Sequence, residues 1–77
     1  KSTAMPSAGR AALRIFSVDG RLVRGWNLGA LPSGRHRVRW DGRDDAGRGC
    51  GSGVYFCRLN VDGEKRFEAS RTMLLVK

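Results

Sequence analysis

Trp40-Asp41-Gly42-Arg43-Asp44-Asp45-Ala46-Gly47-Arg48 is the stretch that decides the fold of this chain, together with Gly53-Val54-Tyr55-Phe56-Cys57 shortly after it. The positions that follow Trp40 are all Asp, Gly, Arg or Ala, a composition that suits a chain reversing its direction in water. The second run is rich in β-branched and aromatic side chains, which favours an extended strand. The pair therefore predicts a strand ending at Trp40, a polar turn region and a second strand starting at Gly53.

The residues on either side of this turn alternate with a period of two, which predicts half-buried strands. Before the turn, Arg35, Arg37 and Arg39 share one face of a strand over residues 35–40, and His36, Val38 and Trp40 share the other. After the turn, we expect Tyr55, Cys57 and Leu59 to face the same interior as Trp40, and Val54, Phe56 and Arg58 to lie on the reverse side.

Two Asp-Gly pairs predict further chain reversals. Asp19-Gly20 separates a strand over residues 11–18 from a partner over 21–26, and Asp62-Gly63 precedes a last strand over 65–77. Residues 27–34 are expected to form a loop, and residues 1–5 the end of a first strand. No segment has the apolar period of a helix, so the sequence predicts an all-β fold, a small antiparallel sandwich of about six to seven strands. Its inward candidates include Ala11, Leu13 and Ile15, and on the last strand Phe67, Met73 and Leu75.

The spacing of Gly53, Tyr55 and Cys57 is that of a tyrosine corner. In immunoglobulin-type sandwiches this tyrosine lies two residues before a core cysteine and bonds back to the backbone. Trp40 on the neighbouring strand fits the central core aromatic of such a fold. These residues predict an immunoglobulin- or fibronectin-like sandwich without an inter-sheet disulfide, because no second cysteine lies on an opposing strand.

The length of 77 residues predicts a single domain over residues 1–77. A chain of this size buries only about 60–65% of the surface that its unfolded form exposes, which leaves little room for a deep catalytic cleft. We find no catalytic candidate and expect neither enzymatic activity nor a cofactor. No apolar run approaches the roughly 18 residues of a membrane span, and no leader segment is visible. Since the chain begins with Lys1, we expect a processed or excised piece of a longer protein.

The net charge of +8 favours anionic partners. The row formed by Arg35, Arg37 and Arg39 is the predicted partner-binding surface, suited to an acidic protein or an anionic surface glycan. A merely solvated face is the alternative. Nucleic acid is not expected, because neither interleaved exposed aromatic residues nor a groove-entering helix is apparent.

Carboxylates and thiols near the turn raise the question of a metal site. Asp41, Asp44 and Asp45 are close enough in sequence to hold calcium, but the full ligand ladder and its distal Glu are missing. We expect Asp41 to accept backbone N–H groups of its own turn, and Asp44 or Asp45 to pair with arginine. A Cys50–Cys57 disulfide would need a taut reversal between them, so we expect Cys57 to be a small core residue and Cys50 a half-buried loop residue. Their spacing matches no zinc motif.

With these residues described, the chain resembles the immunoglobulin-like domain named after the flagellar hook-capping protein. The match runs from about Pro6 to Lys77, and its specific part is the run from Trp40 to Tyr55. Supporting segments lie at residues 18–24, 31–39 and 71–77. Cys57 stands where the family more often has an aromatic residue. The signature positions are Trp40, Asp41, Gly42, Asp44, Gly47, Gly53, Tyr55 and Cys57.

The resemblance implies a non-catalytic module from the C-terminal part of an exported bacterial protein. Such domains occur at the ends of secreted or surface proteins, where they are labelled type IX-like sorting domains. The implied roles are secretion sorting, cell-surface attachment or assembly outside the cell. The implied partners are upstream domains of the parent protein and either the secretion machinery or an acidic surface glycan. A glycan-binding module with Trp26 and Tyr55 as platforms is a third interpretation.

The main alternative is a structural subunit of an extracellular filament or of a hook-cap-like assembly, joined through β-strand contacts. Family members usually carry a further N-terminal strand, of which only residues 2–6 are a candidate remnant here. A sheet lacking that strand has an open edge, which is a template for self-association.

Overall fold

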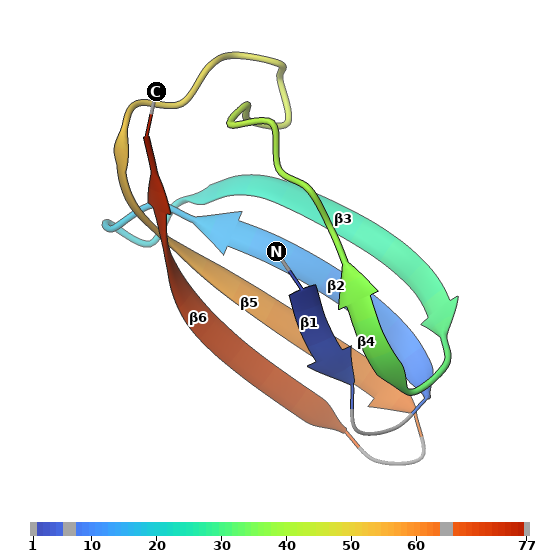
Figure 1. The fold of residues 1–77 in the computed structure, drawn as a ribbon. Coiled ribbons are helices and arrows are strands. Elements are labelled where there is room, and N and C mark those ends of the chain that lie inside the picture. Colours follow the sequence, from blue (N-terminus) through green and yellow to red (C-terminus); the bar gives the residue numbers. More distant parts are fainter. Residues whose placement is uncertain (1, 6–7, 64–65, 77) are drawn as a thin grey trace.

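The structure is a computed structural model that describes residues 2–5, 8–63 and 66–76, and within them the side chains of residues 8–34, 38–63 and 66–76. The molecule is elongated, with principal extents of 37 × 20 × 19 Å. Its described residues form strands joined by turns and, over residues 38–52, by a longer connection (Figure 1). The strands are β1 (Ser2–Met5), β2 (Gly9–Phe16), β3 (Leu22–Leu31), β4 (Gly34–Arg37), β5 (Gly53–Gly63) and β6 (Phe67–Leu75).

Four of these strands form one antiparallel sheet in the order β3-β2-β5-β6, and β1 pairs with β4 in a separate antiparallel ladder. In Figure 1 the short β1–β4 ladder lies in front of the larger sheet. The predicted all-β class is confirmed, and the four antiparallel strands are consistent with an immunoglobulin-like fold.

The β2–β3 hairpin forms at the predicted Asp19-Gly20 pair. Gly20 has φ of +85°, a left-handed conformation that glycine adopts without steric cost. The Gly20 N–H donates to the Ser17 carbonyl at 3.0 Å, and the Ser17 N–H donates to the Arg21 carbonyl at 2.9 Å. Local sequence alone therefore determines this reversal.

Several predicted boundaries are wrong, including that of the strand expected over residues 11–18, which is β2 at Gly9–Phe16. β3 continues to Leu31, so residues 27–31 are strand and not loop, because they stay paired with β2 across a register irregularity between Ala11 and Ala12. β4 ends at Arg37 rather than Trp40, since its partner β1 is only four residues long. β5 extends to Gly63, where it pairs with the first residue of β2. A turn after Gly63 would fall on residues 64–65, outside the described residues.

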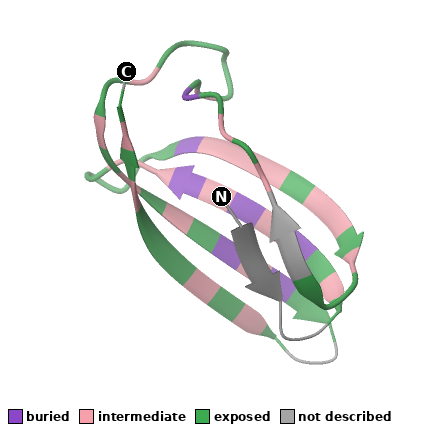
Figure 2. Ribbon diagram, viewed as in Figure 1, coloured by how far each residue is buried: buried purple, intermediate pink, exposed green. Residues whose placement is uncertain are grey.

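The core lies on one face of the two central strands. Leu13 is directly opposite Leu59, and Ala11 is directly opposite Val61, so the four side chains stack across the β2–β5 ladder. Figure 2 shows the buried positions concentrated on β2 and β5. Ile15 extends this row, which confirms the predicted inward residues of β2. The buried hydrophobic residues are Ala11, Leu13, Ile15, Val23, Leu59 and Val61.

The strands beside the core show the expected alternation. On β5, Tyr55 and Cys57 are half-buried, whereas Val54, Phe56 and Arg58 are exposed. On β6, Phe67, Met73 and Leu75 are half-buried and alternate with exposed residues. The sheet therefore has an inner face, which carries the core, and an outer face on the opposite side. On β2, Arg10 and Ala12 lie on the outer face.

Candidate functional site

The segment between β4 and β5 is held on the inner face by an aromatic pair. The rings of Trp40 and Tyr55 meet edge to face, with centroids 5.1 Å apart and an interplanar angle of 72°. The Trp40 Nε1–H donates to the Arg43 carbonyl at 2.9 Å, and the Tyr55 hydroxyl donates to the Gly51 carbonyl at 2.7 Å. The tyrosine thus bonds back to backbone upstream of itself, which is the geometry of a tyrosine corner.

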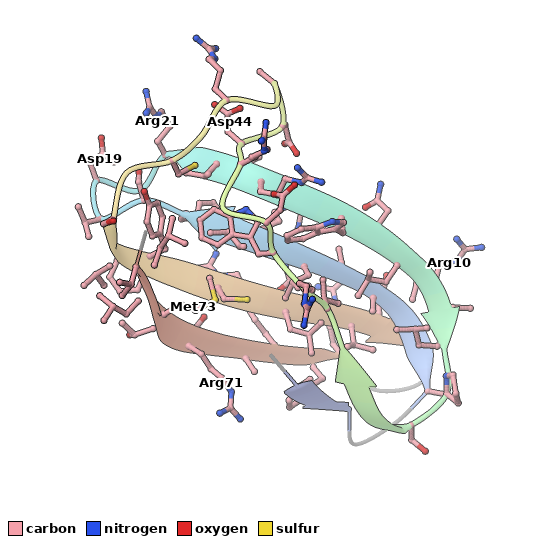
Figure 3. The ribbon with its side chains drawn as sticks, turned by 45° about the horizontal axis from the view of Figure 1, so that its top comes forward. Arg10, Asp19, Arg21, Asp44, Arg71 and Met73 are labelled. Carbon is pink, nitrogen blue, oxygen red and sulfur yellow. The ribbon has the colours of Figure 1, made fainter. Side chains whose placement is uncertain are left out.

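The acidic turn is built by carboxylates that accept local backbone N–H groups. Asp41 accepts from the Arg43 N–H at 3.0 Å, and Asp44 accepts from the N–H groups of Ala46 and Arg48 at 3.0 and 2.9 Å. Gly42 and Gly47, with φ of +77° and +83°, supply the left-handed positions of this turn. Figure 3 shows Asp44 within this loop, beyond the end of the sheet. The aspartates and glycines of this segment therefore determine the conformation of its backbone.

The same loop covers the beginning of β3. The Asp45 N–H donates to the Val23 carbonyl at 3.0 Å, and the Gly25 N–H donates to Asp45 Oδ1 at 3.2 Å. Arg24 lies 3.7 Å from the Asp45 carboxylate and 4.0 Å from that of Asp41, and its guanidinium sits 5.1 Å from the centre of the Trp26 ring. Asp45 therefore pairs with backbone groups of Val23 and Gly25 that a neighbouring strand would otherwise bond, and so covers the beginning of this sheet edge.

The expected roles of the three aspartates agree with this geometry. Arg48 pairs with Asp44 at 3.8 Å and Arg24 with Asp45, so arginines occupy the surroundings in which calcium would have to bind. Among the described residues no group of three or more His, Cys, Asp or Glu side chains is arranged to hold a metal ion. Cys50 and Cys57 are half-buried and not joined by a disulfide, and Cys57 packs against the core.

The predicted arginine row lies largely outside the residues whose side chains the structure describes. Arg35 and Arg37 belong to β4 by their backbone, but their side chains, like that of His36, lie outside the described residues. Arg39 is exposed and follows the end of β4, so it does not continue the strand alternation.

Sequence reasoning missed a mixed apolar and basic cluster on the outer face. Phe16 is directly opposite Phe56, and Val54 is directly opposite Leu74. Val54 and Phe56 are each 42% exposed, and Leu74 is 69% exposed. The strand alternation already placed Val54 and Phe56 on the reverse side, and the inward positions Ala11, Leu13 and Ile15 imply the same for Phe16. The sequence did not reveal that β2 pairs with β5, which brings Phe16 and Phe56 together.

Arginine borders this outer-face cluster. The Arg58 guanidinium lies 5.5 Å from the centre of the Phe16 ring and 3.6 Å from the Glu68 carboxylate. Such a cation over a ring adds about 0.5–1 kcal/mol at an exposed site. The cluster is therefore amphipathic, with two aromatic rings beside a partly neutralised charge.

The two edges of the four-stranded sheet differ. The β3 edge carries Asp45 at its beginning, whereas β6 is the last strand in the sheet order and, among the described strands, pairs with β5. β6 keeps one continuous register with β5 from Phe67 to Leu75, without a bulge. An edge strand of this kind exposes a row of backbone N–H and C=O groups to an incoming strand. None of the described residues form a helix with the length and apolar character that a membrane span requires.

Comparisons with known proteins agree with this geometry. Among solved structures, the crystal structure of FlgD from P. aeruginosa has the same fold, with a TM-score of 0.80 and 24% sequence identity. The match covers 95% of this chain and 57% of that one, so the chain spans little more than half the length of its structural neighbour. No curated protein sequence matches the chain. The family model of the FlgD Ig-like domain matches residues 2–65, and the chain therefore belongs to the FlgD Ig-like domain family.

Proposed function

We propose that this domain is a non-catalytic structural module, which joins neighbouring subunits or domains of a bacterial assembly outside the cell through β-strand contacts. The observation that carries the proposal is the open β6 edge on a domain of the FlgD Ig-like family. An unpaired strand edge offers main-chain hydrogen bonds to another strand without the need for a pocket. A hook-cap-like assembly is the class of structure that the family name suggests.

Secretion sorting and surface attachment remain the second interpretation of the sequence. They would rely on recognition of the exposed arginines, of which Arg39 is the described member. The strand-mediated function is favoured over them because it uses a feature that the geometry displays, a long edge with regular register. We infer further that the partners are upstream domains of the parent protein or like modules, and that the protein is exported.

The β1–β4 ladder contributes to the proposal as a second layer. Val38, directly after β4, packs against the core cluster, which brings this part of the chain onto the inner face of the main sheet. We infer that the two layers make a small sandwich, whose β1 edge would accept a further N-terminal strand from the parent protein. The domain would then be one module of a longer chain.

Self-association of the purified chain tests the proposed function. Sedimentation velocity over a concentration series should show reversible oligomers, and negative-stain electron microscopy should show regular assemblies at the highest concentrations. A matched variant with Arg35→Glu, Arg37→Glu and Arg39→Glu should assemble as the parent chain does, because strands carry the contact. A monodisperse monomer at every concentration would contradict the proposal, and loss of assembly in the triple variant would favour recognition through the basic row.

A further inference from the structure

We propose that the β6 edge is the contact between two copies of this chain, formed by antiparallel pairing of the two β6 strands about Ser70. The inference rests on the proposed function and goes beyond it by naming the edge, the occupant and the register. It joins two four-stranded sheets into one continuous sheet.

The contrast between the two sheet edges selects β6. The β3 edge is occupied at Val23 and Gly25 by the backbone and carboxylate of Asp45. β6 is nine residues long and contains neither Pro nor Lys, the residues with which proteins commonly protect an edge. The one inward-facing charge is Arg71, which is exposed and projects away from the sheet (Figure 3). An inward-facing charge disfavours edge pairing, so a contact at β6 has to use a register in which Arg71 avoids a second arginine.

The side-chain pattern of β6 selects a second copy and one register. If both apolar faces are to lie on the same side of the joined sheet, opposed residues must share the same parity, because side chains alternate along a strand. Full overlap would centre on Arg71 and place two guanidinium groups directly opposite each other, which is unfavourable. Moving the centre to Ser70 costs little overlap and places Arg71 opposite Ala69 of the second copy.

The Ser70 register also pairs the apolar positions well. Phe67 lies opposite Met73 of the second copy on the inner face, where both residues are only half-buried in one copy. On the outer face, Leu74 lies opposite Arg66 of the second copy. The aliphatic stem of that arginine would cover Leu74, which is 69% exposed in one copy. The edge strand thus complements its own antiparallel image.

Disulfide trapping tests the register. Ser70→Cys is introduced in a background of Cys50→Ser and Cys57→Ala, and the purified chain is oxidised gently at a concentration where it associates. Residue 70 faces itself across the two-fold axis, within the Cα separation of about 7 Å that a disulfide allows, so we expect a covalent dimer. Thr72→Cys is the matched control on the same face of the same strand. It faces Glu68 of the second copy and should stay monomeric under the same oxidation.

Charge exchange at the same position provides an independent readout. Ser70→Lys alone and Ser70→Glu alone should each weaken dimer formation by about two- to five-fold, because like charges meet across the axis. An equimolar mixture of the two variants should recover the affinity. Circular dichroism verifies that each variant remains folded, as expected for an exposed position.

The outcomes separate this inference from the proposed function. The β6 contact would be overturned if the chain associates but Ser70→Cys forms no covalent dimer and the two charge variants do not change the affinity. The proposed strand-mediated assembly would then stand, through another edge. Trapping at Thr72→Cys instead of Ser70→Cys would overturn the register. A chain that stays monomeric at every concentration would overturn both.

Discussion

Hydrogen bonds from short side chains to nearby groups hold the two turns that frame the inner face. Asp44 accepts two backbone N–H groups of its own loop, from Ala46 and Arg48. Ser17 donates its hydroxyl to the carboxylate of Asp19 in the β2–β3 turn. This hydrogen bond is the largest contribution that lowers the pKa of Asp19 below its ordinary value of 3.8. The backbone N–H groups of Asp19 and Arg21 and the positive charge of Arg21 lower it further.

Ser17→Ala should raise the pKa of Asp19 in the folded protein, because the largest cause of its lowering is removed. A carboxylate whose pKa is lower in the folded than in the unfolded state stabilises the fold above its unfolded pKa, and this contribution is lost as the pH falls through the folded pKa. The variant should therefore lose less stability than the parent chain as the pH falls below about 4, where aspartates ordinarily titrate. An NMR titration of the Asp19 carboxyl carbon measures the shift, with Ser52→Ala as control. An unchanged Asp19 pKa would contradict the assignment.

Among the strands, sequence pattern was reliable where local residues decide the structure. The Asp19-Gly20 hairpin, the Tyr55 alternation and the backbone role of Asp41 all follow from residues within a few positions of each other. The end of β4 and the length of β3 were predicted wrongly, because they depend on the strands that pair with them. The protected β3 edge was not predictable either, since it joins Asp45 to Gly25 across 20 positions.

Asp45→Ala should expose the β3 edge without unfolding the domain. The variant loses the acceptor of the Gly25 N–H and the ion pair with Arg24, an expected cost of about 0.5–1.5 kcal/mol in unfolding free energy. Amide hydrogen exchange at Gly25 should become about ten-fold faster, since the amide is opened to water. Asp62→Ala is the matched control, as Asp62 is exposed near the end of β5. Equal exchange at Gly25 in both variants would argue against the protective role of Asp45.

On the scale of the whole molecule, stability depends on a small core. The buried side chains come from three strands of the large sheet, and Ile15 and Val61 are each only 1% exposed. A domain of this length has an expected unfolding free energy of roughly 4–12 kcal/mol, so the loss of a few methyl groups is a substantial fraction of it. The outer face contributes much less, because its apolar residues remain partly in water.

Ile15→Val should lower the unfolding free energy by about 0.5–1.5 kcal/mol, because one methylene group is removed from a fully packed position. Val54→Ala, on the exposed outer face, should change it by less than about 0.5 kcal/mol. Urea unfolding followed by Trp fluorescence measures both, at a concentration where the chain is monomeric. A larger loss of stability for Val54→Ala than for Ile15→Val would contradict the assignment of the core to the inner face of the sheet.

The contact between Gly42 and Leu75 has a consequence for biosynthesis. Gly42 is buried against Leu75, whose methyl groups would lie 3.4 and 3.6 Å from a side chain at that position. The middle of the chain is therefore completed by residues that leave the ribosome last within this domain, and β2 likewise waits for β5. Contacts so distant in sequence form slowly. The nascent polypeptide consequently remains open, and accessible to chaperones, until the ribosome has passed the codon for Leu75.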